Sequence, residues 1–116
     1  FIEGYNEKIS VTKKRMIKSM SELHSLLKKN NIKLSVVVYP WPQQIQNDVI
    51  NSQHVNMWQH FCISKCENFI NFFPKFFKEK NETSYLQVYK KYYFWNDVHF
   101  NSLGNKFIAD NLLDIF

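Results

Sequence analysis

The sequence predicts an α/β fold in which parallel strands are flanked by helices. Apolar residues at helical spacing precede a β-branched run at residues 32–39, and helical patterns then alternate with short extended segments along the remaining chain. The 116 residues are 45% hydrophobic and 17% aromatic, which is enough apolar material to build a core. No repeat or low-complexity linker divides the chain. We therefore expect residues 1–116 to form a single domain or part of one.

The first element is predicted to be an amphipathic helix over residues 11–29. Its apolar residues recur with the i, i+4, i+7 and i+11 spacing of one helix face: Met16, Met20, Leu23 and Leu27. Asn30 and Asn31 would then end the helix. Residues 32–39 are rich in β-branched side chains and are halted by Pro40, which predicts a buried, parallel strand.

Residues 40–44 are predicted to be a rigid loop at the carboxyl end of that strand. Pro40 and Pro42 both lack an N–H and both restrict the residue before them, so the sheet cannot continue through them. Ligands of open α/β sheets bind at this end of the strands, which makes the loop a candidate wall of a binding site. The alternative is a proline-rich strand terminator with a packed Trp41.

A second helix is predicted over residues 53–73, with Pro74 as its natural stop. Its apolar face would carry Val55, Trp58, Cys62, Cys66, Phe69 and Phe73. We expect Cys62 and Cys66 to pack on that face as small hydrophobic side chains, because a disulfide between them would strain a helix. His54 and His60 would lie on different faces, which argues against a shared metal ion.

The C-terminal third is predicted to alternate between irregular, extended and helical segments. Residues 75–83 are charged and expected to be irregular, whereas residues 85–89 and 92–95 are aromatic-rich and expected to form short strands. A last helix would be capped by Asn101 or Ser102, with Gly104 permitting a close approach or a tight first turn. Its inner face would carry Phe107, Ile108, Leu112, Ile115 and Phe116.

The formal net charge of +5 would suit a nucleic acid or another anionic polymer. The lysines, however, are scattered along the chain, so we expect a solvated basic surface and no nucleic-acid partner. The longest apolar runs are a few residues, far below the ~20 that cross a bilayer. No transmembrane segment is expected.

The residues best suited to catalysis are Asp97 and His99. A histidine acts as general base toward a serine hydroxyl when its other ring nitrogen is held by a carboxylate. In an extended backbone, residues two apart lie on one face, so Asp97 would hold His99 in this way. An ordinary surface pair ahead of a helix is the alternative.

Two segments together resemble SGNH/GDSL-type hydrolases: residues 97–109, DVHFNSLGNKFIA, and residues 36–42, VVVYPWP. The first resembles the last conserved block of that family, in which an Asp and a His precede an Asn or Pro, a Gly and a helix. The second resembles the buried strand and proline-bearing loop before that block. Spanning residues 11–116, the resemblance implies the C-terminal part of a three-layer α/β/α, flavodoxin-like domain.

By this resemblance, His99 would take the proton from a nucleophilic serine, and Asp97 would orient the imidazole. The usual esterase spacing, Asp-x-x-His, would place Asn96 in the acid position. The Asp-x-His spacing is closer to the alginate O-acetyltransferase-like branch, which implies acyl chemistry on a carbohydrate, with hydrolysis and transfer both open.

The family's nucleophile and oxyanion donors lie in blocks at the start of the domain, and no serine of this chain has that setting. We therefore assign no nucleophile and expect these residues to be inert alone.

The acceptor side would be lined by Trp41, Gln43 and Gln44, because aromatic rings stack on sugars and amides bind hydroxyls. The mechanism needs no cofactor or metal, and chemistry on surface polysaccharides would imply an exported location, periplasmic in a bacterium. The competing hypothesis is a non-catalytic, basic, aromatic-rich module that binds an anionic polymer or a protein.

Overall fold

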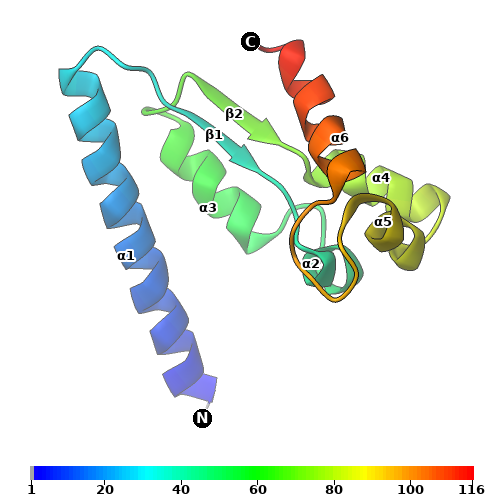
Figure 1. Ribbon diagram of the computed structural model, residues 1–116. Helices are drawn as coiled ribbons and strands as arrows, with labels where there is room; N and C mark the ends of the chain where they lie inside the picture. The colour runs from blue at the N-terminus through cyan, green and yellow to red at the C-terminus, as the bar shows by residue number, and fades with distance from the viewer. Residues whose placement is uncertain (1) are drawn as a thin grey trace. The chain divides into compact units, whose positions relative to one another are not determined.

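The computed structural model describes residues 2–116, with side chains described from residue 7. Its elements in chain order are α1 (Ile2–Lys29), β1 (Ser35–Val38), α2 (Pro42–Asn47), α3 (Gln53–Cys62), β2 (Asn68–Asn71), α4 (Phe73–Glu82), α5 (Tyr85–Tyr92) and α6 (Ser102–Leu113) (Figure 1). They fall into two compact units. The first combines the residues up to Val36 with Met57–Ile70, and the second combines Val37–Asn56 with Asn71–Phe116.

Helix α1 ends at the point that the sequence predicted, although it begins well before residue 11. The Ile32 N–H donates to the Leu27 carbonyl at 2.9 Å, and the Asn31 N–H donates to the Lys28 carbonyl at 3.2 Å. These two bonds, with a φ of 56° at Asn31, form a Schellman motif. Asparagine tolerates this left-handed conformation better than most residues do, so the Asn-Asn pair ends the helix.

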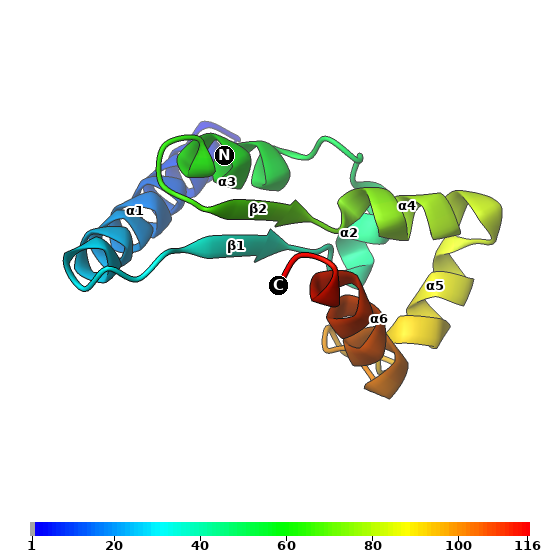
Figure 2. The same cartoon turned by 90° about the horizontal axis from the view of Figure 1, so that it is seen from above.

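Strands β1 and β2 form a two-stranded parallel sheet, and Figures 1 and 2 show them side by side, pointing the same way. The Glu67 N–H bonds the Leu34 carbonyl at 2.7 Å, and the Phe72 N–H bonds the Val38 carbonyl at 2.9 Å. The α/β class is thus confirmed in its coarse form. The described residues do not form the three-layer, flavodoxin-like arrangement. Among them, only β2 pairs with β1 to form the sheet, and most of the chain after β1 forms short helices.

The long helix predicted over residues 53–73 is wrong, because α3 ends at Cys62 and β2 follows. In the intervening turn, the Lys65 and Cys66 N–H groups donate to the Cys62 carbonyl at 3.2 and 3.1 Å. The expectation that Cys62 and Cys66 stay free is also wrong, since they form a disulfide with Cα atoms 4.6 Å apart. Cys66 lies beyond the end of the helix, so the bond does not have to span two positions of one helix face.

Two prolines begin helices that the sequence predicted to be absent. Pro74 lies in the first turn of α4, and Pro42 lies in the first turn of α2. The first N–H groups of a helix have no partner inside it, so proline costs nothing there. The segment predicted to be irregular at residues 75–83 is therefore helical through Glu82, and Gln43 and Gln44 belong to α2 and not to a loop.

The strand predicted at residues 85–89 is helix α5. The Ser84 hydroxyl accepts a hydrogen bond from the Gln87 N–H at 3.1 Å and so caps the helix. Val88 and Tyr92 face inward and are buried. Immediately after α5, Tyr93 pairs with Phe100 in an isolated antiparallel bridge.

The core of the second unit is built from aromatic rings around Phe76, which is fully buried. Its ring lies 5.5 Å from that of Tyr92, 5.9 Å from Phe100 and 5.2 Å from Phe107, between ring centroids. Phe107 thus faces inward as predicted, whereas Ile115 and Phe116 of the predicted inner face are exposed. Within residues 2–116, we find no helix with the length and apolarity needed to cross a membrane.

Candidate functional site

The segment from Tyr93 to Phe100 is a closed loop between α5 and α6. Besides the bridge between its two ends, the Phe94 N–H donates to the His99 carbonyl at 3.0 Å. The Asn101 N–H donates to the carbonyl of Tyr92, the last residue of α5, at 2.9 Å. These bonds hold the segment that contains Asp97 and His99 at both ends.

A tight turn at the tip of this segment presents Asp97. The Asp97 N–H donates to the Phe94 carbonyl at 3.2 Å, and Asn96 has a φ of 57°. Asparagine is one of the few residues that adopt this conformation readily, so Asn96 serves the turn. The expected extended backbone from Asp97 to His99 is wrong, because this stretch is a bend.

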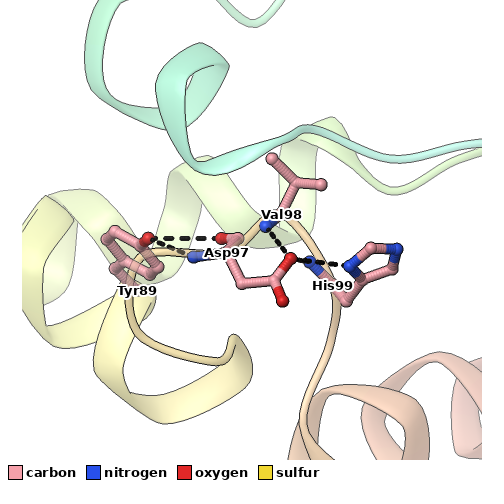
Figure 3. A network of polar contacts seen from close by, with 4 residues as sticks. All are labelled: Tyr89, Asp97, Val98 and His99. Atoms are coloured by element: carbon pink, nitrogen blue, oxygen red, sulfur yellow. Dashed lines mark hydrogen bonds and ion pairs between the residues drawn. The ribbon is translucent and has the colours of Figure 1, made fainter.

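The structure nevertheless brings the two side chains together (Figure 3). His99 Nδ1 lies 2.6 Å from Asp97 Oδ1, which also accepts the N–H of Val98 at 2.6 Å and the N–H of His99 at 3.2 Å. The carboxylate therefore reaches the imidazole by folding back over its own backbone. The partner of His99 is Asp97, and Asn96, which the alternative spacing would have used, is taken up by the turn.

These hydrogen bonds lower the pKa of the Asp97 carboxyl below its ordinary value, first through the His99 side chain and then through the N–H groups of His99 and Val98. An ionised carboxylate accepts hydrogen bonds and cannot donate them. His99 Nδ1 must therefore carry the proton in this contact, which leaves Nε2 of the neutral imidazole with a free electron pair. The His99 side chain is 77% exposed, so that electron pair is accessible to a reactant.

Two further residues support this geometry, Tyr89 and Asn101, and this role was predicted for neither of them. The Tyr89 hydroxyl bonds the backbone of Asp97, accepting from its N–H at 3.1 Å and donating to its carbonyl at 3.2 Å (Figure 3). The Asn101 side chain caps α6, as predicted, and also donates to the carbonyls of Lys91 and Tyr93. The i, i+3, i+4, i+7 spacing of the apolar residues after Ser84 was the signal that Tyr89 is helical.

The proline-bearing segment lies beside the segment that carries His99. The rings of Tyr39 and Phe100 have centroids 4.9 Å apart, and the Tyr93 hydroxyl donates to the Pro40 carbonyl. Trp41 is 54% exposed. The two regions that the resemblance singled out, far apart in sequence, are thus neighbours within the second unit.

The three residues predicted to bind substrate differ in whether their side chains are free to contact a ligand. Gln43 is exposed on α2. Gln44 uses its side-chain oxygen to accept the N–H of Trp41 at 2.9 Å, so it helps to begin the helix. Trp41 keeps its indole exposed, which makes Trp41 and Gln43 the better candidates for contact with a ligand.

The serines of the described chain serve other purposes or lie elsewhere. Ser52 is buried and accepts the Val55 N–H, Ser84 caps α5, and Ser35 accepts from the Asn68 amide. Among the side chains described from residue 7 onward, no hydrogen bond joins a serine to His99. Over the same residues, no cluster of three His, Cys, Asp or Glu side chains could hold a metal ion.

Comparison of the chain with protein-family models, curated proteins and solved structures found no match.

Proposed function

We propose that this chain supplies the Asp and His of a Ser-His-Asp triad in an SGNH-like serine esterase or O-acyltransferase. The observation that carries the proposal is the 2.6 Å contact between His99 Nδ1 and Asp97 Oδ1, formed inside the block that resembles this family. The contact leaves Nε2 free to act as a base. The closeness of the proline-bearing segment adds support, because both parts of the resemblance lie in one region.

The proposed reaction is acyl transfer through a covalent intermediate. His99 Nε2 removes the proton of a serine hydroxyl as the serine oxygen attacks the ester carbonyl, and the imidazolium then protonates the leaving alcohol. Water or a sugar hydroxyl, deprotonated by the same nitrogen, attacks the acyl carbon, and the imidazolium returns that proton to the serine oxygen as the acyl–serine bond breaks. Asp97 stabilises the imidazolium in both steps. The serine and the oxyanion donors belong, in the family, to blocks that residues 1–116 do not carry.

The finer parts of the proposal concern fold and substrate. The two parallel strands would be part of the larger sheet of a three-layer α/β/α domain. Trp41 and Gln43 would line the acceptor side, since an exposed indole stacks on a sugar ring and an amide bonds its hydroxyls. The substrate would then be an acylated carbohydrate or small molecule, and chemistry on a surface polysaccharide would take place outside the cytoplasm.

The test is labelling with a fluorophosphonate probe, applied to the protein together with any segment encoded before Phe1. We expect one serine to be labelled and His99→Ala to lower turnover of an acetyl ester by several orders of magnitude. His60→Ala is the matched control, because His60 is an exposed histidine outside the segment, and it should leave turnover unchanged. Absence of serine labelling, or full activity of His99→Ala, would refute the proposal.

A second candidate is a binding module for an anionic polymer, favoured by exposed aromatic rings close to lysines. Trp95 is 57% exposed, and the Lys90 ammonium lies 5.9 Å from its ring centroid. Binding of this kind should weaken steeply with added salt and survive His99→Ala. Titration of an anionic glycan at two salt concentrations separates it from the triad, and binding that is absent or independent of salt removes it.

A further inference from the structure

The ring of Tyr89 is held in place on α5 by three aromatic neighbours. Its centroid lies 5.0 Å from that of Trp95, 5.9 Å from Tyr85 and 6.0 Å from Tyr93, the last in an edge-on contact. Tyr85 and Tyr93 lie one turn before and after Tyr89 along the chain, and Trp95 reaches back from the loop. The position of the hydroxyl is therefore set by packing on a helix.

Both hydrogen bonds that this hydroxyl makes in the described chain are with the backbone of Asp97. It accepts the Asp97 N–H at 3.1 Å and donates to the Asp97 carbonyl at 3.2 Å, so one oxygen engages both polar groups of a single residue (Figure 3). Two hydrogen bonds from one rigid group restrict where the Asp97 backbone can lie. The Asp97 side chain, in contrast, is 44% exposed, and among the described residues its hydrogen bonds are with Val98 and His99.

Asp97 needs such support because exposed ion pairs contribute little by themselves. A surface pair typically gives ~0–1 kcal/mol, since water competes for both partners and the side chains lose entropy when they are held. Asp97 also lies in a bend, where one backbone hydrogen bond, from its N–H to the Phe94 carbonyl at 3.2 Å, is shared with the Tyr89 hydroxyl and no regular ladder of such bonds holds it. Its carboxylate can stay on His99 Nδ1 only if its backbone is held by something else.

We infer that Tyr89 is a positioning residue, which fixes the Asp97 backbone so that the carboxylate keeps His99 in the tautomer with Nδ1 protonated and Nε2 free. Within the described residues, Tyr89 makes no hydrogen bond or ring contact with His99, and it acts through Asp97. The inference rests on the proposed function to the extent that the pair has a catalytic task. The tautomer itself is a property of residues 89–99 and needs no serine and no substrate.

The experiment is NMR of the imidazole nitrogens of His99, recorded at a pH at which the ring is neutral. Nitrogen shifts and long-range couplings to the ring protons distinguish the two tautomers. We expect the Nδ1–H form to dominate in the wild type. Tyr89→Phe keeps the ring and its packing but removes the oxygen, and it should lower the ratio of Nδ1–H to Nε2–H about fivefold, as the loss of one net hydrogen bond would.

Two variants make the result specific. Tyr85→Phe removes a hydroxyl from the same helix, one turn away, that makes no hydrogen bond within the described part of the chain, and it should leave the ratio unchanged. Asp97→Asn should reverse the ratio, because an amide can donate to Nδ1 and so favours the other tautomer.

The inference is overturned if Tyr89→Phe keeps the wild-type ratio while Asp97→Asn shifts it, or if Tyr85→Phe shifts it equally. In an active form of the protein, Tyr89→Phe should lower kcat and leave KM unchanged. A changed tautomer without any serine labelling would support the positioning role and count against the proposed function, so the two failures are distinguishable.

Discussion

Asn101 joins the end of α5 to the start of α6 and so closes the segment that carries Asp97 and His99. Its side-chain oxygen accepts the Gly104 N–H at 2.9 Å, which caps α6. Its amide nitrogen donates to the Lys91 carbonyl at 3.0 Å and to the Tyr93 carbonyl at 3.3 Å. Replacing Asn101 by Ala removes all three bonds at once.

The expected cost of Asn101→Ala is about 2 kcal/mol in the free energy of unfolding. Loss of the cap contributes ~1 kcal/mol. Loss of the two amide bonds contributes about 1 kcal/mol together, because water can reach the more exposed Lys91 carbonyl and the Tyr93 carbonyl is partly buried. Asn101→Ser keeps a cap oxygen and loses the amide, so it should cost about 1 kcal/mol, half as much.

Urea unfolding followed by tryptophan fluorescence measures both values through the shift in the midpoint at constant m. The control is Asn105→Ala, one turn further along α6 on its exposed side, which should stay within ~0.5 kcal/mol of the wild type. If Asn101→Ala is as stable as that control, Asn101 does not join the helices. If Asn101→Ser is as unstable as Asn101→Ala, the division of the stability cost between the helix cap and the two amide hydrogen bonds is wrong.

Three further predictions follow from the same structure. Gly104→Ala should destabilise the protein by about 1–3 kcal/mol in thermal unfolding, although alanine favours helices, because the new Cβ would lie 2.2 Å from the Tyr92 carbonyl oxygen; a variant as stable as the wild type would contradict this. Burial raises the pKa of the Tyr93 hydroxyl. The contribution of Tyr93 to the free energy of unfolding is therefore complete below the unfolded pKa of about 10 and is lost as the pH rises above that value. The free energy of unfolding measured by urea titration should therefore fall by ~1.4 kcal/mol in total between pH 9 and 11 for this group, with most of the fall above pH 10, and Tyr93→Phe should remove that part of the pH dependence. Reduction of the Cys62–Cys66 disulfide should lower stability by about 2 kcal/mol, and the unreduced, denatured protein should show no free thiol in a colorimetric assay; two free thiols would refute the bond.

Features that depend on a few neighbouring residues could be predicted from the sequence. The end of α1 at Asn31, the cap at Asn101 and the close approach at Gly104 are of this kind. So is the pairing of Asp97 with His99, although the backbone bends where we expected it to be extended. Except at Gly104, where the close neighbour is the more distant Tyr92 carbonyl, the side chain acts on groups within five residues or the residue type tolerates a conformation that others avoid.

The aromatic-rich half of the chain could not be predicted in this way. Aromatic residues suit strands, yet their spacing after Ser84 also fits a helix, and the cap together with burial of Val88 and Tyr92 favours α5. Pro74 suits a helix stop, because proline interrupts a helix interior, but it also suits the first turn of a helix, where no N–H is needed. Its position at the start of α4 places Phe76 in the centre of an aromatic cluster whose other members come from α5, α6 and the loop between them.

By itself, the sequence determined which residues are candidates for the proposed chemistry, namely Asp97 and His99, and where α6 begins. Tertiary structure decided what holds that pair, because the contacts of Tyr89 with Asp97 and of Tyr93 with Pro40 join segments that are not adjacent in the chain. It also decided that Cys62 and Cys66 form a disulfide, since that depends on where α3 ends. Such choices rest on burial and on partners brought together by folding, which local spacing does not contain.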